Sequence, residues 1–266
     1  MTSSGHFIPH RRTRPPTIIS GDNEIFKKLM VLQTSKGIRK SGEFLAGGPK
    51  LLAELIQPPI ADITAWIGTP DMPPPAEAAA CRWIVLSGQR FQEVNVMGTQ
   101  GPLVTLRLPD IPEFDRTAAW PDGCTLFIPF GDPENVGAVI RAAAGLGAAR
   151  VVVLRDAACP FLPKAVRASA GTIWKIRLES GPLLKDLMTE GTAPLFALDP
   201  DGAPLNQISP PNYYGLVAGM EGQGLPDEIL ERATRVSIPL SNHVESLNAA
   251  TAASIALWAW RSDKGT

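Results

Sequence analysis

Apolar residues in the first hundred positions of the chain recur in short runs whose spacing changes between that of a helix and that of a strand. Ile25, Leu29 and Leu32 recur at helical spacing behind an Asp and an Asn, either of which can cap a helix, and this predicts one helix over residues 22–37. The runs that follow are separated by polar or Pro-rich connections, which indicates a small α/β unit of about 85 residues. The further elements predicted in it are a strand at 44–46, a helix at 50–56 and strands at 63–67, 82–86 and 103–108.

Residues 109–123 interrupt this alternation. They contain three prolines and no apolar periodicity, which is typical of a linker between domains. Beyond them the alternation returns as a strand at 125–130, a helix at 133–146 with a possible cap at Asp132, and a strand at 150–154. The remaining predicted elements are strands at 172–177, 195–199, 215–220 and 236–240 and a last helix at 246–261.

The strands of this second half are apolar along their whole length instead of at alternate positions. Strands of this kind are buried on both faces, so the sequence predicts an α/β fold with a mostly parallel sheet covered by helices. The predicted organisation is a disordered basic tail at 1–16, a small α/β domain at 17–108, a linker at 109–123 and a larger α/β domain at 124–266.

The net charge of −1 hides an uneven distribution of charge along the chain. Residues 1–57 contain nine Lys and Arg against four Asp and Glu, which leaves this segment at +5 and the remainder at −6. A basic segment on a mildly acidic body suggests that contact with a polyanion begins near the N-terminus. A charged face that contacts only solvent explains the same distribution, and charge alone does not decide between the two.

Cysteine and histidine give no sign of a metal centre. The three Cys and three His lie far apart without a Cys-x-x-Cys pair, so neither a disulfide framework nor a metal site is expected. The Arg pair near the N-terminus has no apolar stretch behind it, so neither a Sec nor a twin-arginine signal fits. The longest apolar stretch, residues 249–260, is about half as long as a membrane span needs. We therefore expect a cytoplasmic protein.

A polar segment follows the first strand of the second domain, at the start of a helix. Ligands bind at the carboxyl ends of strands in open α/β sheets, so Asn135 and Arg141 are candidates for a site. Their separation of six residues places them about 240° apart around a helix. Neither can therefore share a face with the apolar Val136, Val139 and Ile140. A capping residue and a solvent-exposed Arg would also explain the pair.

Three glycines surround one acidic residue where a later strand enters a loop. Gly219, Gly222 and Gly224 permit a backbone to approach a ligand closely, and Glu221 can accept hydrogen bonds from ligand hydroxyl or amine groups. The spacing is not that of a dinucleotide fingerprint, and no Lys-Ser/Thr follows as it does in a P-loop. An ordinary tight turn is the alternative.

Polar residues also follow the strand that precedes the last helix. This strand ends in Ile238, Pro239 and Leu240, and the predicted helix begins with a segment that contains Ser246 and Asn248. The hydroxyl of Ser246 and the amide of Asn248 can bond a ligand or cap the helix. Capping alone explains Ser246 but hardly Asn248, which is poorly suited to a helix interior.

In this order and at these separations, the three segments resemble the motifs of the SpoU, or TrmH-like, branch of the SPOUT superfamily of RNA methyltransferases. The resemblance covers nearly the whole chain, because the small domain is similar to the L30e-like substrate-binding domain often fused to this catalytic domain. Each motif alone is weak, but the three together are specific. The matching residues are Asp132, Pro133, Asn135, Gly137 and Arg141 in the first motif, residues 219–225 in the second, and residues 238–240 and 246–248 in the third.

The resemblance implies both a fold and an activity. The fold is a SPOUT domain with a deep trefoil knot, a rare exception to the absence of knots in proteins, and the chain forms a homodimer through it. The activity is transfer of a methyl group from S-adenosylmethionine to a ribose 2′-hydroxyl of structured RNA, with rRNA favoured over tRNA. The implied donor-binding residues are Leu198, Asp199, Gly219, Glu221, Gly222, Ile238, Leu240 and Leu247, and the implied RNA-binding residues are Lys27, Lys28, Arg39 and Lys40.

The chemistry assigns roles to the catalytic candidates. Because an Arg resists deprotonation, we expect Arg141 to act as a cation that stabilises the developing 2′-oxyanion, while Asn135 orients Arg141 or the ribose. By resemblance, Glu221 holds the donor or shapes its loop, and Ser246 and Asn248 position the target nucleotide. Two alternatives remain: a SPOUT enzyme that methylates a base, and an RNA-binding or ribosome-assembly protein without activity.

Overall fold

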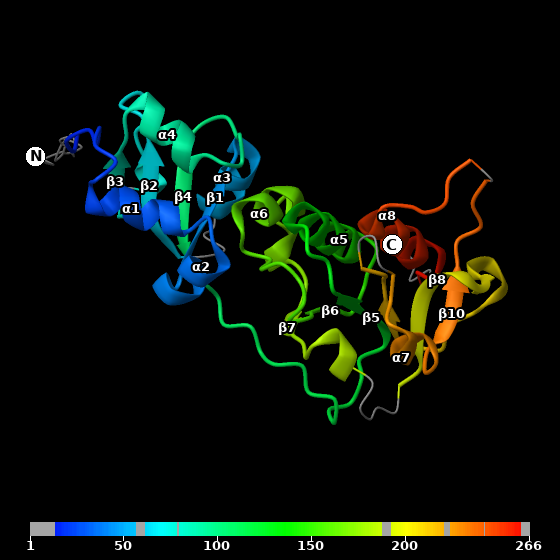
Figure 1. Ribbon diagram of the computed structural model, residues 1–266. Coiled ribbons are helices and arrows are strands. Elements are labelled where there is room, and N and C mark those ends of the chain that lie inside the picture. The colour runs from blue at the N-terminus through cyan, green and yellow to red at the C-terminus, as the bar shows by residue number, and fades with distance from the viewer. Residues whose placement is uncertain are drawn as a thin grey trace, which may run out of the picture.

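The computed structural model contains two α/β units joined by an extended segment, each unit built around its own sheet (Figure 1). The residues that it describes are 14–56, 62–78, 80–187, 193–220, 224–241 and 243–261. Most of the predicted N-terminal tail and the residues Glu221 and Gly222 lie outside the described residues.

The N-terminal unit consists of a four-stranded sheet and the helices that cover it. Its strands are β1 (Glu43–Gly47), β2 (Ile63–Gly68), β3 (Arg82–Val85) and β4 (Leu103–Arg107), and its helices are α1 (Glu24–Val31), α2 (Ser35–Ser41), α3 (Pro49–Ile56), α4 (Gly88–Val94) and the 3₁₀ turn Ala76–Ala78. The strand order is β1-β4-β2-β3, in which β4 is antiparallel to both neighbours and β2 is parallel to β3.

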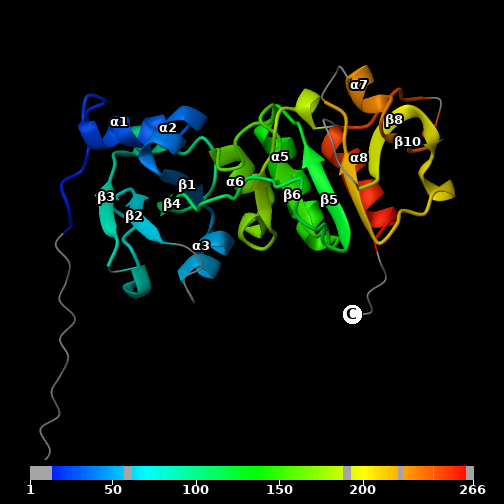
Figure 2. The ribbon, with the colours of Figure 1, turned by 90° about the horizontal axis from the view of Figure 1, so that it is seen from below.

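Both faces of this sheet are buried. Along β1, Leu45 packs with α1 and α4, whereas Phe44 and Ala46 pack with α3 on the opposite face, as expected when successive side chains point to opposite faces. Figure 2 shows α1 and α2 on one side of the strands and α3 on the other.

The predicted single helix over residues 22–37 is wrong, because the chain forms α1 and α2 there. Asn23 caps α1 with its side chain, and the Oγ1 of Thr34 accepts a hydrogen bond from the backbone N–H of Gly37 and so starts α2. A Cβ on Gly37 would lie 1.9 Å from the carbonyl oxygen of Val31, so glycine is needed where the two helices meet.

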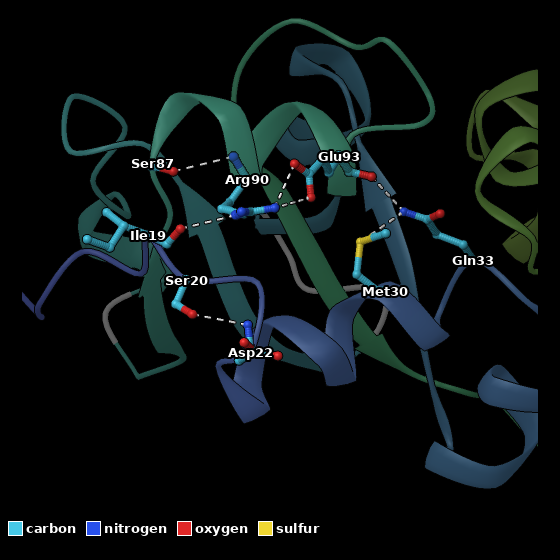
Figure 3. Close-up of polar contacts among 8 residues, drawn as sticks. All are labelled: Ile19, Ser20, Asp22, Met30, Gln33, Ser87, Arg90 and Glu93. Carbon is cyan, nitrogen blue, oxygen red and sulfur yellow. Dashed lines mark hydrogen bonds and ion pairs between the residues drawn. The ribbon is translucent and has the colours of Figure 1, made fainter.

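Residues before α1 are tied to the edge of the sheet. Ile18 pairs with the end of β3, donating its N–H to the carbonyl oxygen of Val85. Arg90 of α4 then donates to the carbonyl oxygen of Ile19 at 3.1 Å and bonds the carboxylate of Glu93 at 2.8 Å (Figure 3). The N-terminal unit therefore begins by residue 18.

The C-terminal unit is built on a six-stranded sheet in which every pair of neighbours is parallel. Its order is β10-β8-β9-β5-β6-β7, so the prediction of a mostly parallel sheet is confirmed. The strands are β5 (Gly123–Ile128), β6 (Arg150–Val153), β7 (Leu178–Ser180), β8 (Leu195–Pro204), β9 (Tyr213–Val217) and β10 (Thr234–Ser237). The helices are α5 (Pro133–Gly145), α6 (Pro163–Ser169), α7 (Asp227–Leu230) and α8 (Ala249–Ala259), with 3₁₀ turns at Thr172–Trp174, Leu184–Asp186 and Leu205–Gln207.

Both faces of the parallel sheet are covered as predicted. Helices α5, α6 and α8 bury their apolar residues on one face, and α7 and the turn Leu184–Asp186 do so on the other. Among the described residues, none of the helices combines the length and the apolar composition that crossing a membrane requires.

Helix α5 has the boundaries that its sequence predicts to within one residue. The Oδ1 of Asp132 accepts a hydrogen bond from the N–H of Glu134 at 2.9 Å, and Gly147, just beyond the helix, has a φ of +78°. A Cβ on Gly137 would lie 2.2 Å from the carbonyl oxygen of Ala165. Packing therefore requires glycine at position 137, because the absence of a side chain lets α6 lie directly against α5.

The predicted strand at 172–177 is wrong. This segment holds the 3₁₀ turn Thr172–Trp174, and β7 begins only at Leu178. The reason is tertiary, because the ring of Trp174 lies 6.0 Å from that of Phe44 in the N-terminal unit. Its neighbour Lys175 bonds Glu54 of that unit at 2.8 Å, so the segment forms part of the contact between the units.

The connection between the units is packed against the C-terminal sheet. The N–H of Phe114 donates to the carbonyl oxygen of Ser180 at 2.8 Å, and the N–H of Ser180 donates to that of Pro112 at 2.9 Å. The rings of Phe114 and Trp120 lie 5.3 and 6.0 Å from that of Phe127. We call residues 109–122 the strap, since they are held along the sheet instead of spanning a gap.

Candidate active site

Loops that carry candidate residues leave one edge of the C-terminal sheet. Because β10, β8, β9 and β5 are parallel neighbours in that order, their carboxyl ends lie side by side. Asn135 follows β5, Leu198 lies where β8 leaves its pairing with β9, Gly219 follows β9 and Ile238 follows β10. The topology thus brings together segments that are more than a hundred residues apart in the chain.

A hydrogen bond joins the first and third motifs. The Nδ2 of Asn248 donates to the Oδ1 of Asn135 at 2.9 Å. The Oδ1 of Asn248 accepts from the N–H of Thr251 at 3.1 Å and so caps α8. The predicted helix at 246–261 therefore starts later than expected, and its cap is Asn248 instead of Ser246. Capping is not the only contact of Asn248, because its amide also bonds Asn135.

Arg141 is exposed on α5. Val136, Val139 and Ile140 are buried under the helix, so Arg141 lies away from the core as the spacing predicted. Its guanidinium makes no hydrogen bond or ion pair with any residue in the described part of the chain. The fold of a single chain therefore leaves this cation available to a ligand.

The described residues of the second motif on either side of 221–223 are bonded to each other. The N–H of Met220 donates to the carbonyl oxygen of Gly224 at 3.2 Å, and Gly224 has a φ of +71°, which suits glycine. A Cβ on Gly219 would lie 3.6 Å from the Cα of Gly224 and 4.0 Å from the carbonyl oxygen of Leu198, which is ordinary contact. Packing of the described residues therefore does not require glycine at position 219, which favours close approach of a ligand there.

The other candidates of the third motif differ in exposure. Ile238 and Leu247 are half-buried, Ser246 is exposed, and Leu240 is 38% exposed. Exposed apolar side chains at this edge are suited to contact with a ligand or another chain.

At this edge lies an ion-pair cluster that no local pattern in the sequence predicts. Arg235 of β10 bonds Asp199 at 2.7 Å and Asp201 at 3.3 Å, and Asp199 raises the pKa of the Arg235 guanidinium above its usual value. The two acidic residues precede Arg235 by 36 and 34 positions, so local periodicity could not have found the cluster.

The RNA-binding candidates are exposed and lie in the other unit. Lys27 and Lys28 are on α1, and Arg39 and Lys40 are on α2. Lys27 is within 3.7 Å of Asp22 and 3.5 Å of Glu24. Arg39 lines a cavity of about 580 Å³ between the two units, beside the loop that follows β6. The structure therefore does not place these four residues in the site at the strand ends.

Cysteine chemistry is disfavoured at the strand ends. Cys124 is the second residue of β5, near the amino ends of the strands, and burial raises the pKa of its thiol to about 12. Burial also raises the pKa of Cys159. In the described segments, no group of three or more His, Cys, Asp or Glu is arranged to hold a metal ion.

Comparison with known sequences identifies relatives of the whole chain. A ribosomal RNA small subunit methyltransferase G 2 from Syntrophobacter fumaroxidans is 41% identical over 91% of this chain, although the chain spans only 48% of that relative's length. The 23S rRNA (guanosine(2553)-2′-O)-methyltransferase RlmP of Bacillus subtilis is 27% identical over 91% of this chain and 97% of its own.

Comparison with solved structures finds the same fold. An rRNA methyltransferase from Sinorhizobium meliloti superposes with a TM-score of 0.75 at 21% identity, over 92% of this chain and 96% of its own. An RNA methyltransferase of the TrmH family from Porphyromonas gingivalis superposes with a TM-score of 0.68 at 29% identity, over 89% and 96%. These likenesses cover both units, so the arrangement of the two sheets is shared with known proteins.

The sequence model of the SpoU rRNA Methylase family matches residues 126–258. This range is half of the chain and contains the three motifs, the parallel sheet from β5 to β10 and most of α8. The family to which the motifs pointed is thereby confirmed, and the chain belongs to the SpoU rRNA methylase family.

Proposed function

We propose that this chain transfers a methyl group from S-adenosylmethionine to a ribose 2′-hydroxyl of ribosomal RNA. The observation that carries the proposal is the bond between Asn135 and Asn248, which joins the first and third motifs at the sheet edge where the second motif also lies. The name of the Bacillus subtilis relative, a 2′-O-methyltransferase of 23S rRNA, supports both the ribose and the rRNA.

The residues at the edge fit the methyl donor. At Gly219 a ligand can approach the backbone closely, because packing of the described residues does not require glycine there. The carbonyl oxygen of Leu198 lies nearby, and Leu198 and Asp199 stand outside the regular strand pairing. We assign donor binding to these three residues, together with Ile238, Leu240 and Leu247, and to Glu221 and Gly222 of the adjoining loop. The bound donor supplies an electrophilic methyl on a sulfonium, which needs no metal.

The chain's own residues would activate the nucleophile. Arg141 supplies a cation to the oxygen that develops negative charge as the 2′-hydroxyl loses its proton, for which a phosphate of the RNA is the acceptor. Asn135, held by Asn248, orients the ribose or Arg141, and Ser246 lies in the same segment to contact the nucleotide. Glu221 holds the donor or shapes its loop.

The function is tested with pure full-length protein in the presence of a chelator. Calorimetry should detect donor binding, and rRNA from cells that lack this gene should accept labelled methyl groups at a position that becomes resistant to alkaline cleavage. A methylated position that stays sensitive to alkali would indicate base methylation instead. No donor binding, with or without RNA, would leave an RNA-binding protein without activity.

We also propose the deep trefoil knot typical of SPOUT domains. Strand β9 lies between β5 and β8, while β10 lies outside β8, so the chain must cross β8 before α8 returns to pack against α5. These crossings are what threading of the C-terminal segment through a loop requires. An experimental structure with a continuous trace from residue 193 to residue 261 decides it.

A homodimer through α5 and α8 fits the apolar surface of the C-terminal unit. Ala138 of α5 and Ile255 and Trp258 of α8 line a groove of about 340 Å³, and Trp258 is 58% exposed. We expect Trp258→Glu to convert a dimer into a monomer in sedimentation experiments, because a buried charge would be introduced on each side. Val31→Glu, at an exposed apolar residue of α1, is the control that should stay dimeric. A dimeric Trp258→Glu protein would place the interface elsewhere.

We assign RNA binding to the exposed basic residues of α1 and α2, in an L30e-like N-terminal unit. Replacing Lys27, Lys28, Arg39 and Lys40 by Ala should weaken rRNA binding. The slope of the logarithm of the binding constant against the logarithm of the salt concentration should become less steep by about one for each phosphate that is no longer neutralised. Donor affinity should not change. Unaltered RNA affinity at moderate salt, measured by filter binding, would contradict the assignment.

A further inference from the structure

Strand β8 is interrupted where it pairs with β10. Arg235 lies opposite Ala197, but the next residue, Val236, lies opposite Ala203. Residues 198–202 are therefore excluded from the pairing with β10, and we call them the 198–202 bulge. The bulge begins with Leu198 and Asp199, two of the residues assigned to the methyl donor.

A single guanidinium nitrogen holds two carboxylates of the bulge. The Nη2 of Arg235 bonds Asp199 at 2.7 Å and Asp201 at 3.3 Å. The side chain of Asp199 is only 12% exposed, so water screens this contact less than it screens an ordinary surface pair. The Oδ1 of Asp199 also accepts from the N–H of Asp201 at 2.8 Å, so the two acidic residues are fixed relative to each other.

Strand β10 also contacts the far end of the bulge. The hydroxyl of Ser237 donates to the carbonyl oxygen of Gly202 at 2.8 Å. A Cβ on Gly202 would lie 2.4 Å from the backbone nitrogen of Val236, so the bulge returns to the sheet in close contact with β10. The shape of the bulge is therefore set by β10, from Arg235 at one end and Ser237 at the other.

We propose that Arg235 is a positioning residue that sets donor affinity by holding the 198–202 bulge in its binding conformation. This inference rests on the proposed function, because it takes the bulge as part of the donor site. Arg235 itself reaches the carboxylates, while the donor would meet the backbone of Leu198 beside Gly219. Preorganisation of this kind lowers the entropic cost of binding.

Removing the guanidinium should loosen the bulge in two ways. It deletes the ion pairs, and it leaves two neighbouring carboxylates that repel each other near a largely buried position. The donor must then order five residues that lack pairing with β10, which costs binding free energy for each residue fixed.

The test compares the donor Kd, the KM for the donor and kcat of full-length variants. Arg235→Ala should raise the Kd and KM about tenfold, which is about 1.4 kcal/mol, while kcat at saturating donor stays within about twofold. Arg235→Lys should restore most of the affinity, because one nitrogen makes both contacts in the wild type. Arg107→Ala removes an exposed ion pair with Asp62 at 3.4 Å in the N-terminal unit, and this control should leave donor affinity unchanged.

The outcomes separate this inference from the proposed function. A wild-type protein that binds no donor refutes the proposed function, and with it the site. If the wild type binds donor and Arg235→Ala binds it equally well, the function stands and the inference is overturned. A fall in kcat as large as the rise in KM, or a failure of Arg235→Lys to rescue, also overturns it, because either result would mean a general structural role.

Discussion

Arg141→Ala is expected to lower the single-turnover rate of methyl transfer by a factor on the order of 10² to 10³, which is typical of removing one preorganised charge at a developing oxyanion. Donor affinity should stay nearly unchanged, since a cation that serves the transition state contributes little to binding of the donor. Protein stability should also stay unchanged, because Arg141 is exposed and bonds no residue of the described segments.

Two variants sharpen this prediction. Arg141→Lys should be nearly as slow as Arg141→Ala if the planar guanidinium must contact the ribose oxygen and Asn135 at the same time. Arg82→Ala, at an exposed Arg of β3, is the matched control and should methylate at the wild-type rate. A dimeric Arg141→Ala protein whose rate stays within about threefold of wild type would refute the catalytic role, since a solvent-exposed helix Arg can be replaced at little cost.

The proposed dimer adds a test of where Arg141 acts. If Arg141 of one protomer completes the site of its partner, mixed dimers of Arg141→Ala with a variant that cannot bind donor should regain one active site. If Arg141 acts within its own protomer, both sites of the mixed dimer are damaged and activity does not return.

The sequence predicted the elements whose causes are local. Helix α5 is an example, because Asp132 caps it and Gly147 follows its end in the left-handed conformation. The apolar runs of β5, β6 and β9 predicted a parallel sheet. That prediction in turn put Asn135 and Gly219 at strand ends, which the strand order then brought to one edge.

Some features escape the sequence patterns although their causes are local. The break between α1 and α2 depends on close contact of Gly37 with Val31, six residues apart, and helix α4, capped by Ser87, was not predicted. Asn248 falls inside the predicted helix because Ser246, two residues earlier, is by residue type an equally suitable cap. The bond of Arg235 to Asp199 joins residues 36 apart, and no spacing rule connects them.

The largest effect on stability is expected from a change in the buried ion pair that lies against the strap. Arg150 and Glu179 are 2% and 1% exposed and bond each other at 3.1 Å, and the Nε of Arg150 donates to Thr125 at 3.0 Å. The guanidinium carbon lies 4.9 Å from the ring centre of Phe114 and 5.3 Å from that of Trp120. The strap is therefore held against the sheet by a buried cation that contacts two of its aromatic rings.

Glu179→Leu is expected to lower the free energy of unfolding by about 3 to 5 kcal/mol, because it leaves the charge of Arg150 buried without its carboxylate. Urea denaturation measures the decrease, and limited proteolysis should show earlier cleavage within residues 109–122. The double variant Arg150→Met with Glu179→Leu should recover most of the stability, since apolar side chains of similar volume can replace a buried ion pair. A Glu179→Leu protein within about 1 kcal/mol of wild type would show that the guanidinium is stabilised without the carboxylate, through Thr125 and the two rings of the strap.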